Sequence, residues 1–257
     1  MSTQKVSKIN QLLQSQPSGV VLLSSWLTEQ GYSLDLQKRY RKSNWLESIG
    51  SGAMKRTGDK VELTGALYAL QFQKGLSIHL GAKSALSYLG KAQYLELSMQ
   101  NVTLLGNKNE DLPKWFSDYP WGIAVDYHSS SFLPAELGLT KIEQPTFKLN
   151  ISGAARAMLE CLYLVPEKQS FLQCYELMDS LNNLRPDLVQ KLLEQCTSVK
   201  VKRLFLYLAE KAKHAWVAYL KQDKIDLGSG KRSLVKNGIY LSKYQITVPE
   251  ELENYGR

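Results

Sequence analysis

The stretch from Gln30 to Leu46 constrains the fold of this chain more than any other part of the sequence. Ahead of it, residues 23–29 have the length and apolar spacing of a short helix. Gly31 permits the tight turn that joins two helices in a helix-turn-helix unit. Residues 33–43 then have the pattern of a second helix, so the segment predicts a helix-turn-helix.

The second helix carries opposite chemistry on its two sides. Ser33 is suited to cap its start, and Asp35 places a negative charge near the positive end of the helix dipole. Leu36 and Tyr40 are four residues apart and define a buried face. The remaining sides carry four basic residues: Lys38, Arg39, Arg41 and Lys42. Such a helix suits the DNA major groove, although a basic face that merely contacts solvent is the alternative.

A basic hairpin is expected directly after this helix. Residues 45–56 are predicted to form a short strand, a glycine turn and a return strand that ends in Lys55 and Arg56. An apolar stripe within residues 5–16 supplies a first helix. Residues 1–60 are therefore predicted to form a winged helix-turn-helix DNA-binding domain, with a polar linker at residues 55–60. The predicted DNA-binding residues are Ser33, Gln37, Lys38, Arg39, Arg41, Lys42, Ser43, Lys55 and Arg56.

The distribution of charge supports a polyanionic partner. Residues 1–60 contain nine basic and four acidic residues, a net charge of +5. Residues 61–149 are close to neutral, and residues 150–257 contain sixteen basic and twelve acidic residues, a net charge of +4. Basic charge therefore gathers in the two terminal parts of the chain, as expected when phosphate neutralisation drives affinity.

Residues 61–257 are predicted to form a larger mixed α/β domain with a helix-rich end, which makes the overall fold class α+β. Strands and helices alternate to about residue 151: helices at 64–74 and 82–89, and strands at 77–80, 94–97, 102–105, 122–127 and 146–151. Helices are then expected at 154–163, 170–181 and 187–196, and one long apolar stripe spans 201–219.

A second basic region lies within residues 199–243, which contain eleven basic and three acidic residues. Its candidate binding surface consists of Lys200, Lys202, Arg203, Lys231 and Arg232. Gly228 and Gly230 precede the last two residues, so this turn is either an anion-binding loop or a simple surface turn. A lysine-rich solvated rim around a core helix is the alternative for the whole region.

Catalytic and metal-binding patterns are missing from the sequence. The segment 75–84 lacks the intact Gly-Lys-Ser unit of a phosphate-binding loop, and the three histidines have no metal-ligand spacing. The odd set of cysteines, Cys161, Cys174 and Cys196, fits buried thiols in a reducing cytosol. The first residues do not have the pattern of a secretory signal peptide. The sequence contains no apolar run of about 18 residues, the length that a membrane-spanning helix needs. We therefore expect a cytoplasmic, non-enzymatic protein with no cofactor, metal or membrane partner.

The chain resembles the AbiEi family of type IV toxin–antitoxin antitoxins, which are bacterial transcriptional regulators. The resemblance rests on Gly19-Val20-Val21, Trp26-Leu27, Gly31, Tyr40, Ser43, Trp45-Leu46, Ile49-Gly50, Gly52-Ala53, the segments 65–71 and 79–86, Leu112-Pro113, Trp115-Phe116, and the segments 199–205 and 227–235. It covers most of the chain, and its motifs are structural and basic rather than catalytic.

The resemblance implies an N-terminal winged helix-turn-helix that binds inverted repeats in promoter DNA and represses its own operon. It also implies a C-terminal domain that counteracts a nucleotidyltransferase-like toxin without forming a stable complex. Under this resemblance the basic set Lys200, Lys202, Arg203, Lys231 and Arg232 is the candidate antitoxin surface. Two other classes remain open from the residues alone. A ligand-responsive winged-helix regulator with no toxin partner would need a defined pocket, and an enzyme acting on nucleic acid would need clustered carboxylates or a metal.

Overall fold

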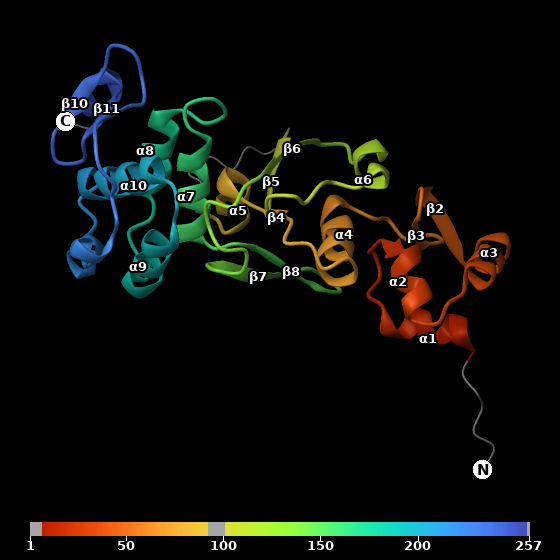
Figure 1. Ribbon diagram of the computed structural model, residues 1–257. Coiled ribbons are helices and arrows are strands. Elements are labelled where there is room, and N and C mark those ends of the chain that lie inside the picture. Colours follow the sequence, from red (N-terminus) through yellow and green to blue (C-terminus); the bar gives the residue numbers. More distant parts are fainter. Residues whose placement is uncertain (1–6, 92–100, 256–257) are drawn as a thin grey trace.

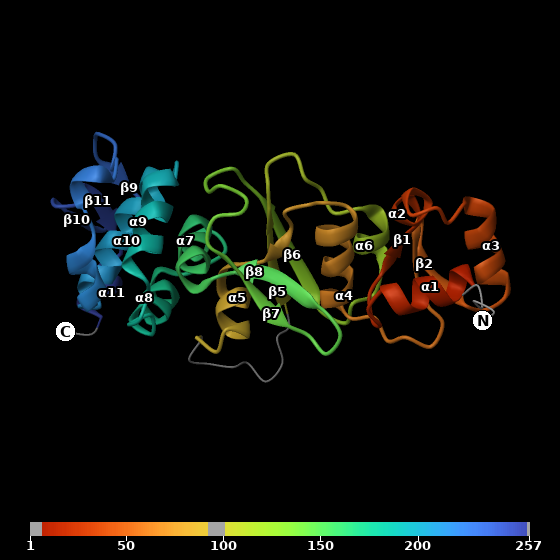
Figure 2. The ribbon, with the colours of Figure 1, turned by 90° about the horizontal axis from the view of Figure 1, so that it is seen from below.

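The computed structural model describes residues 7–91 and 101–255 and shows a mixed α+β fold, with a small N-terminal domain and a larger C-terminal domain (Figure 1). Figures 1 and 2 both show three parts in a row: the N-terminal domain, a central sheet with its helices, and a helical end. No helix in the described ranges is long and apolar enough to cross a membrane.

The N-terminal domain contains, in order, α1 (Lys8–Ser15), β1 (Leu22–Leu23), α2 (Ser24–Glu29), α3 (Leu34–Lys42), β2 (Leu46–Gly50) and β3 (Ala53–Arg56). The strands pair antiparallel in the order β1-β3-β2, with Leu22 opposite Met54 and Glu47 opposite Lys55. The small core beneath the three helices consists of Leu12, Val20, Leu22, Leu27, Tyr32, Tyr40, Leu46 and Met54.

The central part is a mixed sheet of order β6-β5-β4-β8-β7 with helices packed against it. Its elements are α4 (Leu63–Tyr68), the π-helical turn η1 (Ala69–Gln73), β4 (His79–Leu80), α5 (Ala82–Tyr88), β5 (Asn101–Gly106), α6 (Lys114–Asp118), β6 (Ala124–Ser129), β7 (Leu139–Glu143) and β8 (Lys148–Ser152). The expected strand at 94–97 lies outside the described residues. Strand β7 was missed by the sequence analysis, and the helix expected at 64–74 changes to π-helical geometry after Tyr68.

The last part begins with four helices, continues into a small sheet and ends with a short helix. Its elements are α7 (Ala154–Leu164), α8 (Phe171–Asp179), α9 (Pro186–Gln195), α10 (Val199–Lys211), the 3-10 turns η2 (Ala215–Tyr219) and η3 (Gln222–Lys224), β9 (Arg232–Ser233), β10 (Ile239–Leu241), β11 (Ile246–Val248) and α11 (Glu250–Asn254). The sheet of order β10-β11-β9 was not expected from the sequence.

The long helix expected at 201–219 is interrupted in the structure. Helix α10 ends at Lys211, and Lys213 adopts a left-handed backbone with φ of 56°. Trp216 then lies in η2, where its indole donates to the carbonyl oxygen of Leu181 at 2.9 Å. Its ring still packs near Phe205, with centroids 5.9 Å apart. The apolar stripe therefore marked the buried residues of α10 and Trp216 correctly, but it was wrong for Tyr219, which is exposed.

A buried polar network ties the central sheet to α7. The Glu160 carboxylate accepts hydrogen bonds from Ser152 Oγ at 2.7 Å, Arg156 Nε at 2.8 Å and the backbone N–H of Ala82 at 2.9 Å. His79 Nε2 lies 3.3 Å from the same carboxylate. Burial opposes ionisation of Glu160, but the hydrogen bond and charge of His79, with the charge of Arg156, hold its pKa down to about 2. The network is thus an ionised, fully paired centre.

The two domains share a continuous apolar core. Val21, Leu23 and Ala53 of the N-terminal domain belong to the same buried cluster as the central helices. The Gln73 amide bonds the β1 backbone at both ends, since its oxygen accepts from Leu23 N and its nitrogen donates to Val21 O, each at 2.8 Å. The N-terminal domain is therefore docked on η1 rather than connected by the linker alone.

Candidate functional site

Helices α2 and α3 are joined by a short turn at Gly31, whose φ of +83° favours glycine. The hydroxyl of Ser33 accepts from Leu36 N at 3.3 Å, which confirms its predicted role as the cap of α3. Ser43, also expected to contact DNA, is exposed and closes the other end of α3. Asn44 then takes a left-handed backbone with φ of 58°, and the chain turns into β2.

Gln37 lies inside the angle between α2 and α3 and is only 2% exposed. Its amide oxygen accepts from Ser24 Oγ at 2.6 Å, and its amide nitrogen lies within 3.1 Å of Ser24 O and Thr28 Oγ1 and 2.8 Å from Tyr32 O. This placement corrects the expectation that Gln37 reaches DNA, because every polar atom of its side chain is engaged inside the domain. Its role in the structure is to fix α3 against α2.

Two tyrosines complete the support of α3. Burial raises the pKa of both Tyr32 and Tyr40, so both phenols are neutral near pH 7. The hydroxyl of Tyr32 donates to the carbonyl oxygen of Lys8 at 3.3 Å, and Lys8 Nζ donates to Gly31 O at 3.0 Å. These reciprocal bonds tie the start of α1 to the turn before α3.

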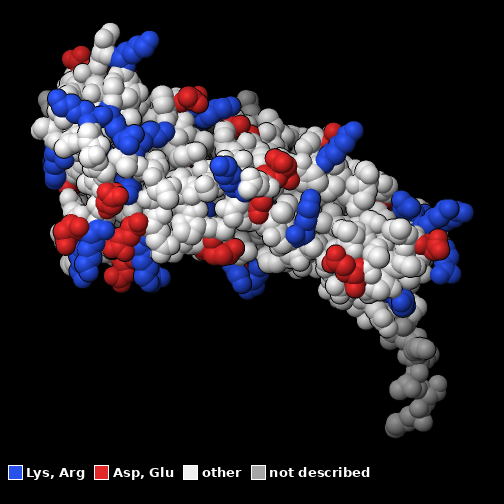
Figure 3. All heavy atoms as spheres, in the orientation of Figure 1, with Lys and Arg blue, Asp and Glu red and all other residues white. Residues whose placement is uncertain are grey.

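The outer face of α3 carries its four cations into solvent. Lys38, Arg39, Arg41 and Lys42 are all exposed, and none pairs with a carboxylate within residues 7–91 and 101–255. In the space-filling view, basic side chains gather at the tip of the N-terminal domain where α3 lies (Figure 3). An unpaired cationic helix face is a suitable surface for a polyanion.

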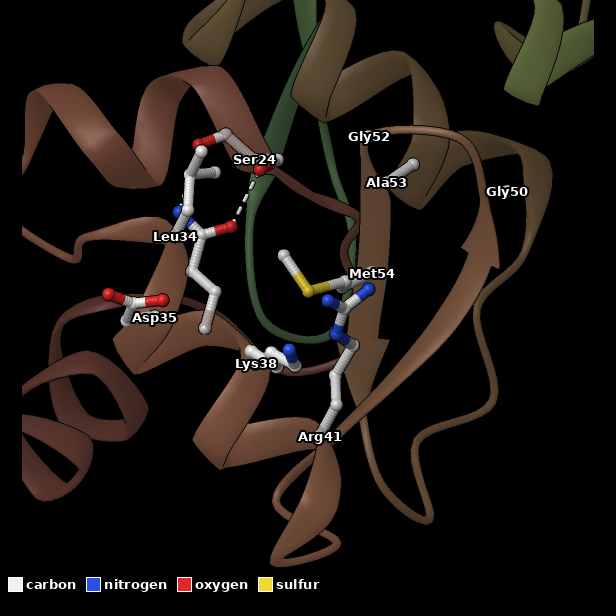
Figure 4. A pocket seen from close by; sticks show the side chains of 10 residues that line it. Ser24, Leu34, Asp35, Lys38, Arg41, Gly50, Gly52, Ala53 and Met54 are labelled. Atoms are coloured by element: carbon white, nitrogen blue, oxygen red, sulfur yellow. Dashed lines mark hydrogen bonds between the residues drawn. The ribbon is translucent and has the colours of Figure 1, made fainter.

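A hollow of about 300 Å³ lies between α3 and the β2–β3 hairpin. Leu34, Lys38 and Arg41 line it from α3, and Met54 lines it from β3. Figure 4 shows Lys38 and Arg41 projecting from α3 on the side that faces the hairpin. The basic face of α3 therefore continues into a shallow recess with an apolar floor.

The two basic residues of the hairpin are engaged inside the domain. Lys55 Nζ lies 3.2 Å from Glu47 Oε2 and donates to Asp59 O at 2.9 Å. The guanidinium of Arg56 donates to the carbonyl oxygens of Leu13, at 2.7 Å, and Gln16 at the end of α1. A cation suits the negative end of a helix dipole. The structure thus corrects the expectation that Arg56 contacts DNA from the wing, because its guanidinium group is engaged at the end of α1.

The hairpin packs against the C-terminal domain at Gly50, the last residue of β2. A Cβ built at Gly50 would lie 2.8 Å from the Cβ of Trp115 in α6, so only glycine permits this approach. Trp115 itself is buried at 5% exposure. The hairpin and α3 are therefore held in one orientation by the neighbouring domain. Trp115 is a positioning residue that the sequence analysis quoted only as part of a family motif.

Three of the five residues in the candidate antitoxin surface are buried or half-buried in the structure. Lys200 Nζ donates to Tyr163 O and Val165 O at 2.8 and 2.7 Å, and burial lowers its pKa. Lys202 is 3% exposed. Arg203 is 2% exposed and donates to four carbonyl oxygens, those of Leu227, Gly228, Gly230 and Gln245. These placements correct the expected continuous basic surface.

Lys231 and Arg232 remain exposed above the loop that Arg203 supports. Lys231 Nζ lies 5.1 Å from the centroid of the Tyr240 ring, a cation–π distance. Burial, with a smaller contribution from the charge of Arg232, lowers the pKa of Arg203. The exposed part of the region is therefore smaller than the sequence indicated.

The sequence analysis did not include Leu34 among the candidate residues of α3, although the side chain of Leu34 is 66% exposed at the start of this helix. A helical wheel contains the signal, because position 34 shares a side with positions 38 and 41 rather than with the half-buried position 36 and the buried position 40. No equivalent local signal existed for Gln37, whose partners come from another helix.

Two family models together match nearly the whole chain. A family model described as transcriptional regulator, AbiEi antitoxin, type IV TA system matches residues 99–249. A second model, transcriptional regulator, AbiEi antitoxin N-terminal domain, matches residues 5–97. A search of curated proteins found no match. Among solved structures, the RV2827C protein from Mycobacterium tuberculosis is similar in fold, with a TM-score of 0.59 and 14% identity over 95% of this chain and 90% of that one.

Proposed function

Because the chain belongs to the AbiEi antitoxin family of type IV toxin–antitoxin transcriptional regulators, we propose that its N-terminal domain is a winged helix-turn-helix that binds operator DNA in its own promoter. The observation that carries this proposal is the outer face of α3, with four exposed cations that pair with no carboxylate in the described ranges. The order α1-β1-α2-α3-β2-β3 and the β1-β3-β2 sheet support the proposal, because two helices joined by a tight turn are followed directly by an antiparallel hairpin.

The proposed interface divides into two parts. Lys38 and Arg41 lie on the hairpin side of α3 and hydrogen-bond base edges in the major groove. Arg39 and Lys42 are three residues apart on the other side of the exposed face and neutralise phosphates. Ser33 and Ser43 flank these residues at the two ends of α3, whereas Gln37 and Arg56 act inside the domain. Lys55 adds little charge because Glu47 pairs with it.

A titration of purified protein with its own upstream DNA tests this division. We expect selective binding over scrambled DNA, with an affinity that falls steeply with salt. Arg39→Ala/Lys42→Ala removes two phosphate contacts and flattens the slope of log K against log salt by about 1.8. The charge-matched control is Lys74→Ala/Lys108→Ala, which removes two exposed cations from the central part of the chain. Equal slopes for the two double variants would contradict the proposal.

Autoregulation and antitoxin action follow from the same proposal. The protein represses its own operon by occupying inverted repeats and counteracts a nucleotidyltransferase-like toxin without a stable complex. Lys231 and Arg232 form the proposed antitoxin surface, because they are the two members of the basic set that remain exposed. The test is growth of toxin-expressing cells that carry Lys231→Ala/Arg232→Ala at wild-type protein level. Full rescue of growth by this folded variant would contradict the proposed antitoxin role of Lys231 and Arg232, and the proposal of DNA binding would still stand.

A further inference from the structure

Leu34 is a large apolar side chain that the fold does not use. It is the first residue of α3, leaves 66% of its surface exposed and is not a member of either buried core cluster of the described residues. A single exposed leucine is common on protein surfaces. Its position is what distinguishes it, because it lies on the face of α3 that carries the proposed base-contacting residues.

Leu34, Lys38 and Arg41 occupy positions i, i+4 and i+7 and line the same hollow beside the hairpin. Met54 supplies an apolar floor to that hollow (Figure 4). Along the helix axis, this face of α3 therefore carries one apolar side chain, Leu34, followed by two cations, Lys38 and Arg41. At a rise of about 1.5 Å per residue, Leu34 and Arg41 are separated by about 10.5 Å. This separation corresponds to about three base-pair steps of about 3.4 Å.

Asp35 limits what the start of α3 can approach. Its carboxylate is exposed, lies in the first turn and lines the same hollow. A carboxylate repels backbone phosphates but accepts hydrogen bonds from exocyclic amines on base edges. The first turn of α3 is therefore suited to the floor of the major groove rather than to its phosphate rim.

The apolar group displayed on that floor is the 5-methyl group of thymine. We propose that Leu34 reads a thymine in each operator half-site by contact with this methyl group, and that Arg41 hydrogen-bonds a guanine about three base pairs away. Leu34 is thus a specificity-determining residue, and the inference rests on the proposed DNA-binding function.

The test changes the DNA and leaves the protein intact. Each thymine of the protein's own upstream binding site is replaced in turn by deoxyuridine, which removes only the methyl group, and binding is measured by fluorescence anisotropy. We expect one position in each half-site where the substitution weakens binding about fourfold, the effect of losing one buried methyl group. At all other thymines the affinity should change by less than twofold.

A protein variant tests whether Leu34 is the residue that contacts the thymine methyl group. Leu34→Ala should bind the thymine and uracil sites equally, because the methyl group has lost its partner. The matched control is Tyr219→Ala, which truncates a side chain that is 75% exposed and distant in sequence from α3, and which should keep the full uracil effect. Thermal unfolding of Leu34→Ala should match that of the wild type, since the side chain is not part of the core.

The outcomes separate this inference from the function on which it rests. Selective binding with no uracil-sensitive position, or with a sensitivity that Leu34→Ala retains, overturns the thymine contact and leaves the DNA-binding proposal standing. Failure of the wild-type protein to distinguish its upstream DNA from scrambled DNA overturns both. Loss of the uracil effect in Leu34→Ala alone establishes the contact.

Discussion

Replacing Gln37 by leucine tests whether the angle between α2 and α3 depends on one buried amide. Leucine approximates the volume of glutamine but makes no hydrogen bonds. The substitution removes bonds to Ser24, Thr28 and the buried carbonyl oxygen of Tyr32. It leaves Tyr32 O without this donor in a buried position.

The expected cost follows from these contacts. A neutral buried hydrogen bond contributes about 1 kcal/mol, and a stranded buried acceptor costs about 1–3 kcal/mol. The total for Gln37→Leu is therefore about 3 kcal/mol. For a chain of this size each kcal/mol shifts Tm by about 2–4 °C, so Tm should fall by about 6–12 °C.

The measurement is thermal unfolding followed by circular dichroism, with Gln14→Leu as the matched control. Gln14 lies exposed on α1 of the same domain, so its replacement should change Tm by little. If Gln37→Leu and Gln14→Leu unfold at the same temperature, the amide does not fix α3, and the reasoning from its hydrogen bonds is refuted.

The remaining predictions concern other buried contacts and use the same unfolding measurement. Arg56→Ala removes the cation at the end of α1 and should cost about 1–2 kcal/mol; unchanged stability would exclude this role. Gly50→Ala places a Cβ 2.8 Å from Trp115 and should cost about 1–3 kcal/mol by overpacking, whereas an unaltered Tm would mean that α6 moves freely. Glu160 has a pKa of about 2 against an ordinary 4.5, so its ionised network stabilises the fold fully above pH 4.5, and this stability is lost as the pH falls toward 2. The stability gap between the wild type and Glu160→Gln should therefore narrow below pH 4.5, and a constant gap would contradict the assignment.

Local patterns in the sequence located the helices of the N-terminal domain well. Ser33 caps α3 as expected, and Tyr40 is buried as the spacing required. The three cysteines are buried thiols, as their scattered spacing indicated. The cap and the burial of Tyr40 depend on residues within one or two turns of one another, which is why the sequence was sufficient to predict them.

Polar residues with distant partners could not be placed in this way. Arg203 belongs to a basic run, but the carbonyl oxygens that bury it come from residues 24–42 positions later in the chain. Gln37 carries no charge and resembles any surface glutamine until α2 is positioned beside it. The short strands β9 to β11 were missed because each contains only two or three residues, too few to give a clear alternating pattern.

The central claim is that the exposed face of α3 enters the major groove of the operator. Its most direct test is DNA cleavage by an iron chelate attached to Ser43→Cys, an exposed position at the end of α3. The native thiols are buried with raised pKa values, so the label reacts at the introduced cysteine. We predict cuts at discrete positions within the upstream inverted repeats, and none from a label at Lys108→Cys. Operator binding without cuts from Ser43→Cys would contradict the account, because α3 would then lie away from the DNA.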